Sequence, residues 1–118
     1  MDVIEFVVNN INNTTCEFKR EVAKLLQAFI INGNLVFPIA DPQAMYENLI
    51  YKNRQNPRVK TTNMRNTLRY FVSQIQTTNN EHAVSKATDM LMRVATTQEK
   101  LYYKNLSDVV NKNIKSHR

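Results

Sequence analysis

The sequence predicts an all-α fold, a compact bundle of five or six helices with short loops in a single domain spanning residues 1–118. Three observations lead to this prediction. A chain of 118 residues suits one domain. One glycine and three prolines are too few for the many turns of a β-sandwich or barrel. Apolar residues recur at helical spacing along most of the chain.

The first helical segment begins at Asp2. This residue precedes an apolar run, and Glu5 follows it at the spacing of a helix start. Apolar residues then line one side of the segment as far as Ile11, where the asparagine pairs intervene.

The second helix has the clearest pattern in the sequence. Thr14 and Glu17 have the spacing of a capping box, which predicts Thr14 as the N-cap. The pair Asn32-Gly33 is expected to end the helix, because glycine readily adopts the left-handed conformation found after a C-terminus. The predicted core stripe comprises Phe18, Val22, Leu25, Leu26, Phe29 and Ile30.

An apolar connector, residues 35–40 (LVFPIA), separates this helix from the next, and Pro38 prevents a helix from running through it. Asp41-Pro42 then starts a short helix that ends near Asn53 and turns Met45, Leu49 and, by the same spacing, Tyr46 and Ile50 inward. After a break at Asn56-Pro57, a further helix starts near Thr61 or Thr62. Its apolar stripe is Met64, Leu68, Phe71, Val72 and Ile75.

The last third of the sequence leaves two alternatives open. Beyond a polar turn at residues 77–80, the stripe Ala83, Ala87, Met90, Leu91 and Val94 predicts a helix. Thr96 and Glu99 form another capping box, so the chain either breaks there or continues to about Asn113. We favour one continuous or gently kinked helix, because two threonines are a weak stop signal. Its inward residues are Tyr102, Leu106, Val109 and Val110.

Positive charge is concentrated in the middle of the chain. The net charge is +6, yet residues 1–47 carry three bases and six acids, whereas residues 48–80 carry six bases and no acid. These bases form a candidate patch for nucleic acid, another anion or an acidic partner: Lys52, Arg54, Arg58, Lys60, Arg65 and Arg69. Arg65 and Arg69 are expected on the helix face opposite Met64, Leu68 and Phe71. Plain solvated surface is the remaining interpretation.

The sequence offers little for catalysis or cofactor binding. Cys16, His82 and His117 are too scattered for a zinc site, and the single glycine excludes glycine-rich nucleotide loops. We therefore predict a protein that is not an enzyme and has no metal, cofactor or catalytic residues. Cys16 is expected to be a small buried side chain in a reducing compartment. The apolar runs are too short for a signal peptide or membrane span, so we expect a soluble intracellular protein, cytoplasmic or nuclear.

Three aromatic residues are candidates for a protein interface. Phe37 lies in the apolar connector, which either packs on its own core or forms an exposed patch that docks or self-associates. Tyr102 and Tyr103 point in different directions on a helix, so one ring is expected to lie partly outside.

The opening MDVIEFVVNN and the wealth of Asn, Lys, Ile and Tyr along the whole chain resemble small virion-associated proteins of baculoviruses, the large insect DNA viruses. The resemblance implies a role in nucleocapsid assembly or nuclear trafficking beside larger capsid proteins, and a location that includes the virion. The size and fold class also resemble the Bcl-like helical bundles of poxviruses. We expect a non-enzymatic assembly or adaptor protein that acts through protein contacts. The alternative is a nucleic-acid-binding accessory protein that uses residues 48–80.

Overall fold

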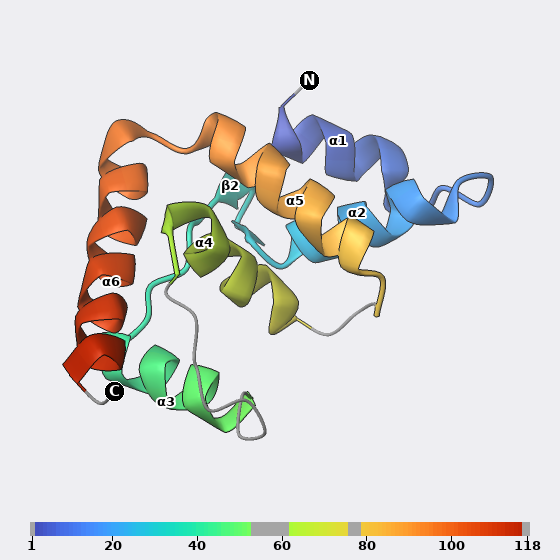
Figure 1. Ribbon diagram of the computed structural model, residues 1–118. Helices are drawn as coiled ribbons and strands as arrows, with labels where there is room; N and C mark the ends of the chain where they lie inside the picture. Colours follow the sequence, from blue (N-terminus) through green and yellow to red (C-terminus); the bar gives the residue numbers. More distant parts are fainter. Residues whose placement is uncertain (1, 53–61, 76–78, 117–118) are drawn as a thin grey trace.

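The computed structural model describes residues 2–52, 62–75 and 79–116. Within these ranges the chain forms six helices and one short hairpin (Figure 1), which confirms the predicted all-α bundle. The helices are α1 (Val3–Asn10), α2 (Glu17–Gln27), α3 (Pro42–Lys52), α4 (Met64–Ser73), α5 (Glu81–Val94) and α6 (Thr97–Ser116). The hairpin pairs β1 (Ile30–Ile31) with β2 (Asn34–Leu35). The predicted break at Asn56-Pro57 lies outside the described residues.

The helices pack in an order that differs from their order in the sequence. α5 lies between α2 and α4, α1 packs on α2, and α6 connects α4 to α3. The molecule measures 47 × 32 × 19 Å, and its radius of gyration is 15.2 Å. A domain of this length is expected near ~13.5 Å when it is close to spherical. The bundle is therefore flat, with one dimension less than half of the longest.

One continuous core runs through the bundle, and it contains the central residues of the predicted stripes. Leu26 of α2 and Leu68 of α4 have no exposed surface. The predicted stripes extend too far at three places, because Phe18, Val94 and Val109 are exposed. In α6 the buried face is centred on Tyr103, Ser107 and Val110 instead of on Tyr102 and Val109.

Local side-chain hydrogen bonds set where several helices start. The Asp2 carboxylate accepts from Glu5 N at 2.7 Å and caps α1, as predicted. The Asp41 carboxylate accepts from Gln43 N at 3.2 Å at the start of α3. Asn63 caps α4 by accepting from Asn66 N at 2.8 Å, close to the predicted start near Thr61 or Thr62.

The prediction that Thr14 caps α2 is wrong. The N-cap position is Cys16, whose side chain makes no capping hydrogen bond. The carboxamide oxygen of Asn13 instead accepts from Thr15 N, Thr15 Oγ1 and Cys16 N, each at 2.9 Å. One asparagine therefore satisfies the donors of the turn that precedes α2, and Thr14 remains exposed.

The predicted end of α2 at Asn32-Gly33 is also wrong. The helix ends at Gln27, and Asn32-Gly33 forms the two-residue turn of the hairpin, with φ of 53° and 77°. Asn-Gly at two positive φ values is the preferred turn for a tight hairpin, because its twist matches that of the strands. Ile30 consequently belongs to a strand instead of continuing the helical stripe.

The chain breaks between α5 and α6, which corrects the favoured continuous helix. Ala95 has an extended backbone with ψ of 137°. Thr96 and Glu99 then form the capping box in both directions, since Thr96 N donates to Glu99 Oε1 at 2.8 Å and Glu99 N donates to Thr96 Oγ1 at 3.2 Å. The capping signal therefore prevails over the continuing apolar periodicity. None of the helices in the described ranges is long and apolar enough to cross a membrane.

Candidate functional site

Two tyrosine hydroxyls fasten the apolar connector to α6. Tyr103 Oη donates to the Pro38 carbonyl at 2.8 Å. Tyr102 Oη accepts from Ala40 N at 3.0 Å and lies 3.2 Å from the Ala40 carbonyl, to which it donates. The connector belongs to no helix and to no strand beyond Leu35, so its polar backbone groups need side-chain partners where they leave solvent. The tyrosines supply those partners across 62 and 65 residues of sequence.

The three predicted interface residues, Phe37, Tyr102 and Tyr103, meet at the connector. Only Phe37 and Tyr102 are partly accessible to solvent. The Phe37 ring lies 6.2 Å from that of Tyr103, and the rings of Tyr102 and Tyr103 are 5.2 Å apart. Tyr103 is fully buried, whereas Phe37 and Tyr102 are half-buried. Tyr103 therefore holds the connector in place and offers no surface to a partner. Its burial raises the pKa of its hydroxyl far above the ordinary 10.0, and the nearby Tyr102 and Glu99 raise it further.

The most exposed large apolar side chain of the described residues sits on this fastened backbone. Ile39 is 84% exposed, although the residues on both sides of it are hydrogen-bonded to the tyrosines. An open cleft of about 250 Å³ lies beside it, and we call this cleft the connector groove. Its lining comprises Phe37, Pro38 and Ile39 from the connector and Gln98, Glu99, Tyr102 and Tyr103 from α6.

Ile39 was not singled out from the sequence. The sequence shows an apolar connector, but an extended segment fastened at Pro38 and Ala40 turns the side chain between them outward. The usable signal is the position of Ile39 directly after a proline, inside a run with no helical period. The partners that fix its direction lie more than sixty residues away, so local pattern could not identify them.

The predicted basic patch is largely untested, and its described members do not form an open anion surface. The side chain of Lys52 is not described, and Arg54, Arg58 and Lys60 lie outside the described residues. Arg65 Nε donates to Asp89 Oδ1 at 2.8 Å, and Arg69 Nε donates to Ser85 Oγ at 3.4 Å. Both arginines are half-buried and donate to residues of α5. Arg65 also lies seven positions before the buried Val72, on the same side of α4, so the two arginines do not lie opposite the apolar stripe as expected.

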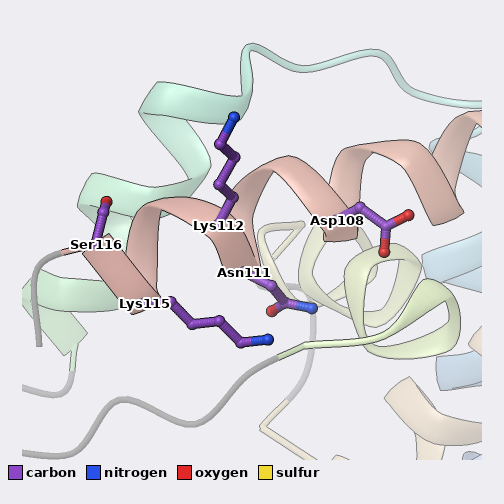
Figure 2. Close-up of a pocket in the computed structure, with 5 residues that line it drawn as sticks. All are labelled: Asp108, Asn111, Lys112, Lys115 and Ser116. Carbon is purple, nitrogen blue, oxygen red and sulfur yellow. The ribbon is translucent and has the colours of Figure 1, made fainter.

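A larger hollow lies at the C-terminal end of α6. It has a volume of about 540 Å³ and is lined by Asp108, Asn111, Lys112, Lys115 and Ser116 (Figure 2). Asn111 accepts from Thr62 N at 2.7 Å and donates to the Thr62 carbonyl at 2.8 Å, so it fastens the segment before α4. Figure 2 shows Lys112 and Lys115 extending to opposite sides of α6, away from a shared point. The hollow is therefore a place of attachment between segments and does not assemble an anion site.

The residues considered for metal or thiol chemistry stay apart from the connector groove. Cys16 is partly exposed at the start of α2, which corrects the expected burial. His82 is exposed in the first turn of α5. Within the ranges that the structure describes, no three His, Cys, Asp or Glu side chains gather closely enough to hold a metal ion. His117 lies outside those ranges.

Comparison of the chain with models of protein families, with curated proteins and with solved structures gave no match. The connector groove therefore has to be interpreted from its own geometry.

Proposed function

We propose that this chain is a non-enzymatic assembly or adaptor protein, and that it binds a protein partner through Ile39 and the connector groove. The observation that carries the proposal is the 84% exposure of Ile39 on a backbone held by two tyrosine hydroxyls. An apolar side chain in such a position gives no benefit to the isolated fold. It becomes favourable when a partner covers it.

The energetics suit a protein contact. Covering an exposed isoleucine completely contributes roughly 1.5–3 kcal/mol. Fastening by Tyr102 and Tyr103 means that the connector loses little freedom on binding, and such preorganisation increases the affinity. The groove volume of about 250 Å³ lies below the ~300–1,000 Å³ typical of small-molecule pockets. The groove therefore suits one apolar side chain of a partner better than a metabolite.

The residues at the rim of the connector groove indicate what type of partner it suits. Gln98 and Glu99 form its polar edge, and the Glu99 carboxylate is already engaged by Thr96 N at 2.8 Å. A small apolar centre with a polar rim is the usual composition of a protein interface. The resemblance of the sequence to virion-associated proteins of baculoviruses supports a capsid protein as the partner, in the nucleus or in the virion. The proposal that residues 48–80 bind nucleic acid has weaker support, because Arg65 and Arg69 face α5.

The test compares two substitutions in affinity capture from the native source, with and without nuclease, followed by mass spectrometry. Ile39→Asp places a charge at the proposed contact, and Val8→Asp is the control at another aliphatic residue, 71% exposed, on α1. We expect wild type and Val8→Asp to recover the same protein partners after nuclease treatment, and Ile39→Asp to lose them. Partners retained by Ile39→Asp, or lost only on nuclease treatment, would contradict the proposal.

A further inference from the structure

A second groove lies between α1 and α5. The two helices lie side by side (Figure 1), and the cleft between them has a volume of about 230 Å³. Apolar side chains form its floor and walls: Val3 and Phe6 from α1, and Met90 and Val94 from α5. Lys86 and Arg93 complete the lining. The groove therefore joins an apolar strip to two cations, and none of the described residues that line it is acidic.

The helical spacing arranges these residues as two parallel rows. Lys86 and Arg93 are seven positions apart and lie on nearly one line along α5, about 10 Å apart along its axis at 1.5 Å per residue. Met90 and Val94 lie beside that line, on the side toward α1. Val94 is 41% exposed, and Phe6 and Met90 are half-buried. An apolar row about one turn long, Met90 and Val94, is thus bordered by a cationic row about two turns long.

Among the described residues, neither Lys86 nor Arg93 forms a salt bridge. Asp89 lies four positions before Arg93, but its carboxylate accepts from Arg65 Nε of α4 at 2.8 Å. At the start of α1, Asp2 and Glu5 are exposed, and neither carboxylate pairs with these cations. Lys86 and Arg93 are both exposed. Arg65, which the sequence suggested as a phosphate contact, instead pairs with Asp89, one turn before Arg93 on α5.

We infer that the α1–α5 groove is a second docking surface, and that its ligand is an acidic amphipathic helix of a partner protein. A partner helix with two acids seven positions apart places both over Lys86 and Arg93. Apolar residues three and four positions after the first acid then face Met90, Val94 and Phe6. Methionine in the floor suits such docking because its side chain adapts to different shapes. With the connector groove on a different pair of elements, the protein can hold two partners together.

The probe is a fluorescently labelled helical peptide of about 16 residues, because shorter helices are marginal in water. It carries Glu at positions i and i+7 and Leu at i+3 and i+4, and its partner peptide has Gln in place of both Glu. We expect saturable binding to the full-length protein by fluorescence anisotropy, with amide chemical-shift changes confined to α1 and α5. The Lys86→Glu/Arg93→Glu variant should weaken binding by about tenfold or more, because both attractions become repulsions.

The matched control is Lys112→Glu/Lys115→Glu, which makes the same change in net charge at the end of α6, far from α1 (Figure 1). We expect this control to bind the peptide as wild type does. The inference is overturned by absence of saturable binding, by equal binding of the Gln peptide, or by equal loss in the control. Binding to anionic lipid vesicles in place of the peptide overturns it as well. Ile39→Asp should bind the peptide normally, so this test and that of the connector groove fail separately.

Discussion

The α2–α5 contact and the surroundings of α6 are held together in different ways. Where α2 meets α5, the buried residues are Val22, Leu25 and Leu26 on one side and Ala83, Ala87 and Leu91 on the other. Around α6, two irregular segments are attached by polar side chains as well. Tyr102 and Tyr103 hold the connector, and Asn111 holds Thr62 at both its N–H and its carbonyl.

The difference follows from where the backbone finds its hydrogen bonds. A helix satisfies its own N–H and C=O groups, so two helices need only complementary apolar faces to associate. An extended segment that packs on a helix leaves its polar backbone groups without such partners. Side chains of the helix must then supply them, and those side chains also fix the direction in which the segment presents its residues. Precise presentation of Ile39 is a consequence of this second type of attachment.

The largest effect on stability is expected at the α2–α5 contact. Leu26→Ala removes a fully buried side chain from α2 and leaves a cavity in the core, which should cost roughly 2–5 kcal/mol of unfolding free energy. Chemical denaturation followed by circular dichroism measures this loss. Leu101→Ala is the control, because Leu101 is 53% exposed and its truncation should change stability by about 0.5 kcal/mol or less. An unchanged midpoint in Leu26→Ala would remove the basis for this apolar contact.

A smaller effect is expected at the tyrosine that holds the connector. Tyr103→Phe keeps the buried ring but leaves the Pro38 carbonyl without its donor, at a cost of about 1–3 kcal/mol. The amide protons of residues near Pro38 should also exchange faster with solvent. A variant as stable as wild type, with unchanged exchange, would mean that ring packing alone attaches the connector.

The pH dependence of stability gives this variant a second measurement. The Tyr103 hydroxyl has its ordinary pKa of 10.0 in the unfolded chain, whereas burial raises the pKa in the folded protein. Above pH 10 the unfolded chain therefore releases a proton that the folded protein keeps. The contribution of this hydroxyl to the free energy of unfolding is therefore fully present below pH 10. Above pH 10 that free energy falls by about 1.4 kcal/mol per pH unit. Tyr103→Phe should therefore make the fall in stability above pH 10 less steep. Part of the fall should remain in this variant, because burial also raises the pKa of Tyr70.

The sequence predicted the apolar core residues better than the attachments around α6. Leu26 and Leu68 follow from helical spacing, which is a local property of a chain. Tyr103, Pro38 and Ala40 are far apart in sequence, so Phe37, Tyr102 and Tyr103 appeared as separate candidates and their meeting could not be foreseen. Two errors came from weighing local signals wrongly. The pair Asn-Gly is typical of hairpin turns as well as of helix ends, and at Asn32-Gly33 it forms the hairpin turn. The Thr96–Glu99 capping box outweighs the apolar period that continues through it.

The smallest effect on stability is expected at the turn between α1 and α2. It tests whether a side chain also fastens irregular backbone beside the helices that form the α2–α5 contact. Asn13→Ala removes the acceptor for Thr15 N, Thr15 Oγ1 and Cys16 N, which should cost roughly 1 kcal/mol. Thr14→Ala is the matched control, because Thr14 is exposed beside the same turn and should change stability by less than about 0.5 kcal/mol. Thermal unfolding of both variants under one condition measures the difference. If Thr14→Ala proved the more damaging substitution, Thr14 would be the cap of α2 in solution. If Asn13→Ala is instead the more damaging substitution, a side chain fastens irregular backbone at this turn just as Tyr103 does at the connector. The two attachments then differ only in how far along the sequence the fastening residue lies.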